Sequence, residues 1–170
     1  MSVALKRQDV MLALKLVALG DASWTYAQLA ESLGMSASEV HQAARRLEVC
    51  GLLSPARRSV NRGALRDFLV HGIAHVFPAA VGRETTGMPT AGSAAPLSGR
   101  LLAGDDARTV WPSPHGKVRG AGVEPLYPSA PDAAARDGAL YGLLTLTDAL
   151  RIGRARERAL AAAELERRLR

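Results

Sequence analysis

The feature that most constrains this chain is the run of residues 25–53, where two helical segments flank a single glycine. Gly34 can adopt the positive φ angle that a tight turn between helices requires. Just after it, the Ser36 hydroxyl is suited to cap a helix, and Glu39 lies where a carboxylate completes a capping box. The run therefore predicts one short helix that ends at Gly34 and a second that starts at Ser36 and extends to about Val49.

The apolar residues of this run repeat at helical spacing, so both helices should pack one face against a common core. The predicted core positions are Leu29, Ala30, Leu33, Val40, Ala43, Leu47, Leu52 and Leu53. The small side chain of Ala30 would let the two helices cross closely. This pattern predicts a helix-turn-helix, a unit whose second helix can lie in the DNA major groove.

The opposite face of the second helix is polar and basic, and its residues are Ser36, Ser38, His41, Gln42, Arg45 and Arg46. Gln42 is suited to read adenine and Arg45 to read guanine through bidentate hydrogen bonds. The two serines and the helix N-terminus suit phosphate oxygens. Three later arginines would neutralise flanking phosphates, unless they only form a solvated basic face: Arg57, Arg58 and Arg62. Arg66 continues the same basic run. Double-stranded DNA is therefore the predicted partner.

The same run carries a resemblance to a known family. Its spacing of small and apolar residues resembles the winged helix-turn-helix of bacterial regulators such as the MarR type, at Leu29-Ala30, Gly34, Val40, Leu47 and Gly51-Leu52. The resemblance covers roughly residues 5–60 and implies a dimeric, DNA-binding transcription regulator whose recognition helix is 37–48. The wing would be short or missing, because Asn61 already looks like the cap of another helix.

The chain as a whole divides into three stretches: a winged helix-turn-helix domain at 1–75, a Pro/Gly-rich wrapping segment at 76–132 and a C-terminal helical association region at 133–170. Residues 77–132 contain eight prolines. Apolar residues such as Trp111 nevertheless favour short strands or an ordered loop over a disordered linker. The predicted fold class is mainly α, with an N-terminal helix-turn-helix, an ordered middle segment and a C-terminal helical pair.

The C-terminal pair, at 133–151 and 154–169, has a leucine-rich surface. That surface could be buried within the chain or against a second copy. Helix-turn-helix proteins commonly pair so that two recognition helices reach successive major grooves, ~34 Å apart. We therefore expect a homodimer.

The charge distribution agrees with an anionic partner. The formal net charge is +6, and residues 41–66 hold six arginines against one glutamate. Residues 151–170 hold seven arginines against three glutamates, whereas residues 67–150 hold eight acidic and six basic side chains. The positive charge is thus concentrated next to the predicted recognition helix and at the C-terminus.

Other chemistries find little support in the residues. His71 and His75 lie one helical turn apart, but no third metal ligand is evident nearby. The segment 111–122 has a Gly-Lys pair without the rest of a nucleotide-binding P-loop. No Ser-His-Asp, Cys-His or paired-carboxylate arrangement stands out. We expect neither an enzyme nor a cofactor or metal.

No apolar run approaches the ~18 residues of a membrane span. Asp9 and Lys15 interrupt the N-terminal apolar stretch, so it does not read as a signal peptide. The expected location is the cytoplasm, without a membrane partner. The single cysteine, Cys50, follows the recognition helix among apolar residues and is expected in the core.

The first hypothesis for function is a transcription regulator that binds a near-palindromic operator as a homodimer. The alternative is a protein-binding winged-helix component, such as an antitoxin-like partner that also autoregulates. Its Pro-rich middle and basic C-terminal helix would then grip another protein. A small-molecule sensor is a further option if Phe77, Trp111 and Tyr127 line a cavity.

Overall fold

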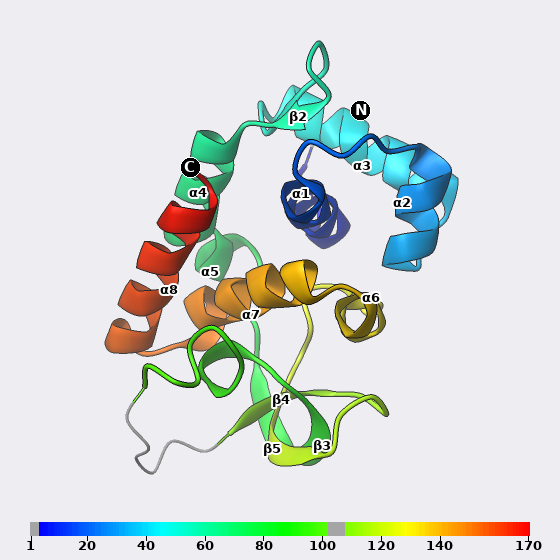
Figure 1. Ribbon diagram of the computed structural model, residues 1–170. Coiled ribbons are helices and arrows are strands. Elements are labelled where there is room, and N and C mark those ends of the chain that lie inside the picture. The colour runs from blue at the N-terminus through cyan, green and yellow to red at the C-terminus, as the bar shows by residue number, and fades with distance from the viewer. Residues whose placement is uncertain (1–3, 102–107) are drawn as a thin grey trace.

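The computed structural model describes residues 4–101 and 108–170. This part of the chain is mainly helical, as the sequence predicts (Figure 1). The helices are α1 (Arg7–Leu19), α2 (Tyr26–Leu33), α3 (Ala37–Val49), α4 (Arg62–His71), α5 (Ile73–Val76), α6 (Ala130–Arg136), α7 (Gly138–Ile152) and α8 (Ala155–Arg168). The strands are β1 (Leu53–Ser54), β2 (Ser59–Val60), β3 (Val81–Pro89), β4 (Thr109–Pro112) and β5 (Val118–Val123), and a 3-10 turn η1 (Ala91–Ser93) follows β3.

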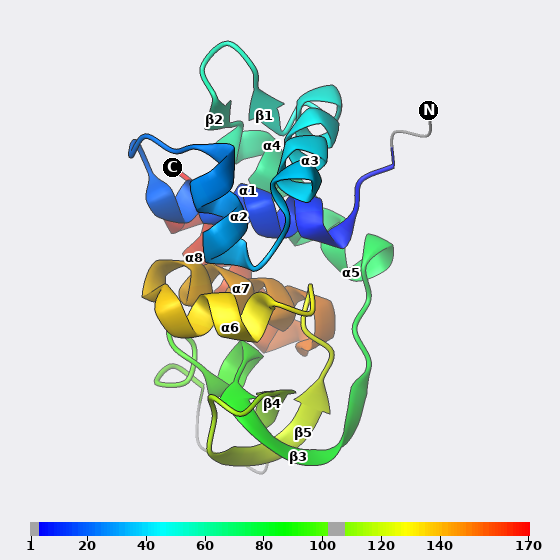
Figure 2. The same cartoon turned by 90° about the vertical axis from the view of Figure 1, so that its right-hand side faces the viewer.

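The elements stack in three layers (Figures 1 and 2). Helices α1, α2 and α3 with the β1–β2 hairpin form one outer layer, α6 and α7 form the middle, and β3, β4 and β5 form the other outer layer. Helix α8 packs against α4 and α7 at one side. The two outer layers therefore present separate surfaces at opposite ends of the molecule.

The turn between α2 and α3 forms as the sequence predicts. Gly34 adopts the left-handed conformation, with a φ of 64°. The Ser36 hydroxyl accepts a hydrogen bond from the Glu39 N–H at 3.1 Å, and a Glu39 carboxylate oxygen accepts one from the Ser36 N–H at 2.8 Å. The eight predicted core positions of this unit are all buried. Local capping chemistry thus sets where α3 begins.

The predicted short wing is present. Strands β1 and β2 pair antiparallel, with Leu53 opposite Val60. Asn61 then caps α4, because its side chain accepts a hydrogen bond from the Ala64 N–H at 3.2 Å. The wing is therefore short: a loop of four residues joins its two-residue strands.

Helix α7 lies at the centre of the molecule, and residues 142–151 are buried on every side. The predicted helix 133–151 is two helices, because the Asp137 carboxylate caps α7 by accepting from the Leu140 N–H at 3.0 Å. The same carboxylate pairs with Lys15 of α1 at 2.7 Å. The leucines of α7 are core residues of their own chain, so they give no argument for a dimer.

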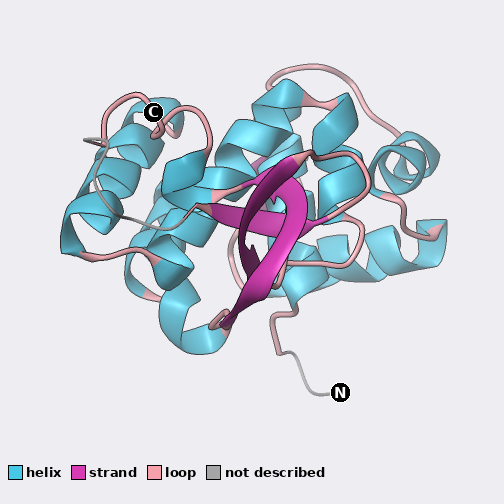
Figure 3. Cartoon of the chain, turned by 90° about the horizontal axis from the view of Figure 1, so that it is seen from below, coloured by secondary structure: helices cyan, strands magenta, loops and turns pink. Residues whose placement is uncertain are grey.

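The middle segment forms a small closed barrel. Strand β3 pairs antiparallel with both β4 and β5, and β4 and β5 are parallel to each other. Figure 3 shows these strands crossing in front of the helices. The crossing is close enough to require glycine at Gly87, since a Cβ there would overlap the Trp111 carbonyl oxygen. The expectation of short, ordered strands is confirmed.

One hydrophobic core includes side chains from all three stretches of the sequence, such as Leu14, Trp111 and Leu146. The three stretches therefore have no separate cores. The expectation for Cys50 is wrong, because this residue is the exposed C-cap of α3. None of the described helices has the length and apolarity needed to span a membrane.

A buried polar network joins the barrel to α7. Asp148 is 1% exposed, and its carboxylate accepts from the Thr90 hydroxyl at 2.7 Å, the Trp111 indole at 2.6 Å and the Arg151 guanidinium at 2.7 Å. Arg151 also donates to the main-chain carbonyls of Phe77 at 2.8 Å and Glu124 at 3.2 Å. These two carbonyls lie just before and just after the barrel strands.

This network predicts a large stability effect. Asp148→Ala should lower the free energy of unfolding by about 3–5 kcal/mol, because it leaves the buried Arg151 without its charge partner. The measurement is urea unfolding followed by tryptophan fluorescence. The control is Asp21→Ala on an exposed turn, expected within about 0.5 kcal/mol of wild type. Equal effects of the two substitutions would contradict the role assigned to Asp148.

Candidate nucleic-acid interface

The outer face of α3 carries most of the residues predicted to read DNA. Ser36, Ser38, His41, Gln42 and Arg45 are all exposed. The Gln42 amide donates to the Ser38 hydroxyl at 3.4 Å, and the Arg45 side chain, 71% exposed, lies 3.5 Å from Glu48. Both contacts are weak enough to be exchanged for contacts with a ligand. The structure thus brings five of the nine predicted residues together on one face.

Arg46 differs from the other predicted residues of α3, because it is paired within the chain. Its guanidinium makes a bidentate pair with Asp9 of α1, at 2.8 and 2.7 Å, and only 14% of its side chain is exposed. The Asp9 side chain is fully buried. The hydrogen bonds to Asp9 raise the pKa of Arg46. Arg46 therefore holds α3 against α1, and its predicted DNA contact would require breaking this pair.

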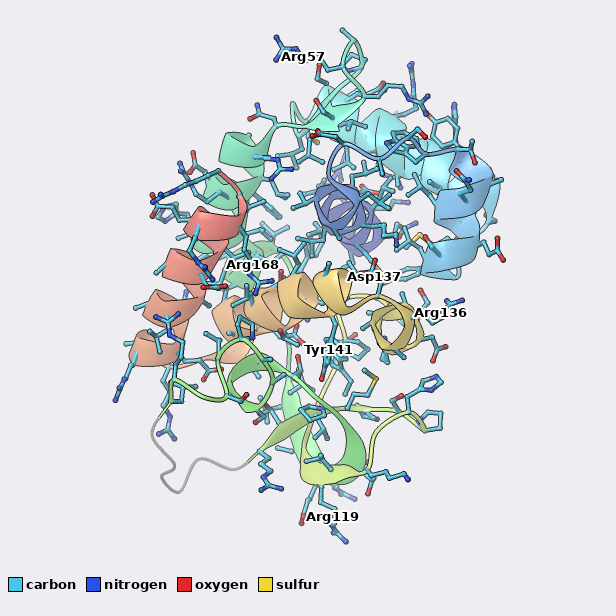
Figure 4. The ribbon with its side chains drawn as sticks, viewed as in Figure 1. Arg57, Arg119, Arg136, Asp137, Tyr141 and Arg168 are labelled. Atoms are coloured by element: carbon cyan, nitrogen blue, oxygen red, sulfur yellow. The ribbon has the colours of Figure 1, made fainter. Side chains whose placement is uncertain are left out.

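The tip of the wing carries the two arginines that the sequence assigns to phosphates. Arg57 is exposed and points away from the molecule (Figure 4). Arg58 is exposed too, but its guanidinium lies 4.0 Å from the centre of the Trp24 ring, and its φ of 50° is left-handed. Arg57 is thus available for a direct contact, whereas Arg58 is already held by an aromatic ring.

That ring belongs to a stack which connects the wing to the recognition helix. The Trp24 and Tyr26 rings meet edge to face at 5.5 Å between centroids, and Tyr26 meets His41 of α3 at 5.2 Å. We call Arg58, Trp24, Tyr26 and His41 the wing stack. Trp24 and Tyr26 are not among the residues predicted from the sequence. The available signal was a pair of aromatics flanking the Thr25 N-cap in a chain with 4% aromatic residues.

Arg62 lies away from the wing arginines, beside α8. Its guanidinium donates to the main-chain carbonyls of Arg168 and Arg170, at 3.3 and 3.5 Å, near the C-terminal end of α8. A cation is favourable there because it complements the carbonyl dipoles of the last helical turn. Arg62 therefore contacts the end of α8 through long hydrogen bonds, and its phosphate contact stays a prediction.

The end of α2 and the start of α3 are both hydrogen-bonded to the connection between β5 and α6. The Tyr127 hydroxyl donates to the Glu39 carboxylate at 3.3 Å, and the Ser129 hydroxyl donates to the Leu33 carbonyl at 2.5 Å. Hydrogen bonds with the Ser36 backbone and side chain lower the pKa of Glu39. Burial, together with the Glu39 charge, raises the pKa of Tyr127. The phenol therefore remains the donor to an ionised carboxylate at neutral pH.

The helix-turn-helix matches a known family model. Residues 11–56 match the IclR helix-turn-helix domain, a stretch that runs from α1 into the wing. Comparisons with curated proteins and with solved structures gave no significant match. The winged helix-turn-helix class predicted from the sequence is confirmed, but the MarR type is not, because the matching domain is of the IclR type. The match supports a DNA-binding transcription regulator.

Substitution of two neighbouring arginines of α3 should change the free energy of unfolding by very different amounts. Arg46→Ala should lower the free energy of unfolding by about 3–5 kcal/mol, because Asp9 would remain buried without a charge partner. Arg45→Ala should change it by less than about 0.5 kcal/mol, because that side chain is mostly exposed. Urea denaturation of both variants tests this. A mild Arg46→Ala effect would return Arg46 to the set of possible DNA contacts.

Proposed function

We propose that this chain, through the IclR-type helix-turn-helix at residues 11–56, acts in the cytoplasm as a transcription regulator that binds a near-palindromic operator as a homodimer. The observation that carries the proposal is the exposed face of α3, where polar and basic side chains lie beside an arginine-bearing wing. The residues matched to the family include all of α3.

Each exposed side chain would have a separate role in DNA binding. Gln42 and Arg45, on the middle of the exposed α3 face, would read base edges in the major groove. Ser36 and Ser38, at the start of α3, would bind phosphate oxygens together with the helix N-terminus. Arg57, at the tip of the wing, would neutralise a flanking phosphate. His41 and Arg58, held in the wing stack, would fix the wing relative to α3.

The size of the footprint supports dimerisation. A single small DNA-binding module buries roughly 600–1,000 Å² of protein surface, below what many specific complexes bury. Two copies with recognition helices ~34 Å apart would read two half-sites of one operator. In this proposal residues 1–75 are the DNA-reading part and residues 133–170 support it from within the shared core. The dimer contact must use a surface other than the buried leucines of α7.

Salt dependence tests the contacts. The probe is fluorescently labelled DNA from the region upstream of the protein's own gene, and the readout is anisotropy over a range of salt concentrations. Gln42→Ala should reduce the discrimination between this DNA and a scrambled duplex by about 1–3 kcal/mol. Arg57→Ala should reduce the slope of log affinity against log salt by about one, on every sequence.

The matched control is Arg66→Ala, because Arg66 is already paired with Asp67 at 2.8 Å. This variant should keep the wild-type slope. If the protein binds no DNA with a salt-sensitive affinity, the regulator proposal fails and the antitoxin-like, protein-binding alternative takes its place.

The wing stack predicts coupled substitutions. Arg58→Ala and Trp24→Ala should each weaken DNA binding, and the double variant should bind about as well as the weaker single variant, because both break one contact. Losses that simply add in the double-mutant cycle would instead make Arg58 an independent phosphate contact.

A further inference from the structure

The proposed function leaves the arginines of the C-terminal helix without a role. The sequence concentrates positive charge there, with seven arginines against three glutamates in residues 151–170. The structure separates these arginines by burial and by pairing. Arg151 is buried beside Asp148, whereas Arg156 and Arg170 are exposed and have no ion-pair partner among the described residues. Helix α8 therefore carries cations that its own fold leaves available.

These two arginines belong to one stripe of α8. At about 100° per residue, positions spaced three or four apart fall on the same side of a helix. The stripe lies opposite the buried side chains of Ala161 and Leu165. Its five residues are all exposed, and we call them the α8 stripe: Arg156, Ala159, Ala163, Arg167 and Arg170. The two alanines between the arginines would let another molecule approach the helix surface closely.

A buried carboxylate cancels only part of the charge beside the stripe. Glu164 lies 2.6 Å from Arg167, 2.8 Å from Arg168 and 3.7 Å from Arg100. Hydrogen bonds from Arg167 and Arg168 lower the pKa of Glu164, so it is ionised at neutral pH. Because one carboxylate faces three guanidinium groups, this cluster keeps a net positive charge. The Arg167 side chain, although paired, is still 70% exposed.

Glu166 is the other acidic side chain in this part of α8, and it is directed towards α4. The hydrogen bonds with Asp67 and, to a smaller degree, the charge of Glu166 raise the pKa of Arg66 on α4. By helical geometry Glu166 lies about 80° around the axis from Arg156. It therefore reduces the positive charge at the edge of the α8 stripe and not along its length.

The C-terminal end of α8 lies next to the element that follows the wing. Helix α4 begins at Arg62, two residues after the end of β2, and the Arg62 guanidinium donates to the main-chain carbonyls of Arg168 and Arg170. From there α8 runs alongside α4, away from the wing (Figure 1). A ligand that extends past the wing would therefore reach the α8 stripe at Arg170 first and at Arg156 last.

Duplex DNA has the charge and the length that this arrangement requires. In the proposed function Arg57, at the tip of the wing, contacts a flanking phosphate, and the duplex beyond it carries one negative charge per about 1.7 Å. The 14 residues of α8 span about 21 Å, so the helix can face about six base pairs of flanking DNA. To reach α8 the duplex must bend, and the elastic cost is offset by the additional phosphate contacts.

We propose that the α8 stripe binds the sugar-phosphate backbone of the DNA that flanks the operator, and that this contact bends the flank around the side of the molecule. The proposal rests on the proposed function, because α3 and the wing must first place the operator. The stripe adds affinity without reading sequence, since contacts between arginines and phosphates position the duplex and do not specify bases.

Two labelled duplexes from the region upstream of the gene test the contact. The core duplex has about 20 base pairs and holds both half-sites, and the flanked duplex adds about 15 base pairs on each side. Arg156→Ala/Arg170→Ala should reduce the slope of log affinity against log salt on the flanked duplex by about two for each bound copy. On the core duplex it should match wild type, because the core ends before α8. The readout is fluorescence anisotropy.

The matched control is Arg119→Ala/Arg158→Ala, which removes the same charge. Arg158 is exposed but lies about 160° around α8 from Arg156, and Arg119 lies at the barrel end of the molecule (Figure 4). This control should keep the wild-type slope on both duplexes. Equal losses in the two double variants would overturn the stripe in favour of a general effect of net charge. All four side chains are exposed, so thermal unfolding of both variants should match wild type.

Bending is measured by energy transfer between dyes at the two ends of the flanked duplex. Wild type should raise the transfer on binding, because the ends come closer together. Arg156→Ala/Arg170→Ala should give a smaller rise, and the control should respond like wild type. A flanked duplex that wild type binds without any rise in transfer would overturn the bent path along α8.

The core duplex separates this proposal from the proposed function. If wild type binds neither duplex with a salt-sensitive affinity, the regulator proposal fails, and the α8 stripe loses this role with it. If wild type binds the core duplex but Arg156→Ala/Arg170→Ala keeps the wild-type slope on the flanked duplex, only the stripe proposal fails. That second result would favour an acidic protein segment as the partner of α8.

Discussion

The buried pair of Asp148 and Arg151 is the interaction on which the arrangement of this chain most depends. Two charges in the interior lose hydration, and they are tolerated only when their remaining hydrogen-bonding groups are largely satisfied. Here Thr90 and Trp111 satisfy the carboxylate, and the guanidinium bonds the carbonyls at the entry and exit of the barrel. One turn of α7 therefore holds both ends of a segment more than 40 residues long.

This attachment has a consequence for the recognition helix. Because Glu124 is held at α7, the connection that follows it is held as well, and it brings Tyr127 to the carboxylate of Glu39. The Lys15–Asp137 pair, at 2.7 Å, ties α1 to the first turn of α7 in the same way. The helix-turn-helix is thus joined to the central helix directly through α1 and indirectly through the connection that carries Tyr127. Its orientation is a property of the whole fold, although its internal geometry is local.

That division explains what the sequence could predict. The start of α3 and the turn at Gly34 depend on residues within four positions of each other, and the wing pairs residues no more than seven positions apart, so capping and turn rules find them. The role of Arg46 depends on Asp9, which is 37 residues away, and the pairing of β3 with β5 is equally non-local. Hydrophobic periodicity predicts which side of a helix is exposed. It cannot show that an arginine on that helix forms an ion pair with a buried carboxylate of another helix.

The same point changes how the net charge should be understood. A charge of +6 with arginines on both sides of the wing suggests a wide basic surface. Arg46, Arg62 and Arg151 are instead bound to groups of their own chain. Glu164 similarly forms ion pairs with Arg167 and Arg168 on α8. The exposed arginines beside this surface are then Arg45 on α3 and Arg57 and Arg58 on the wing. In the proposed function, sequence specificity would therefore rest on these few side chains.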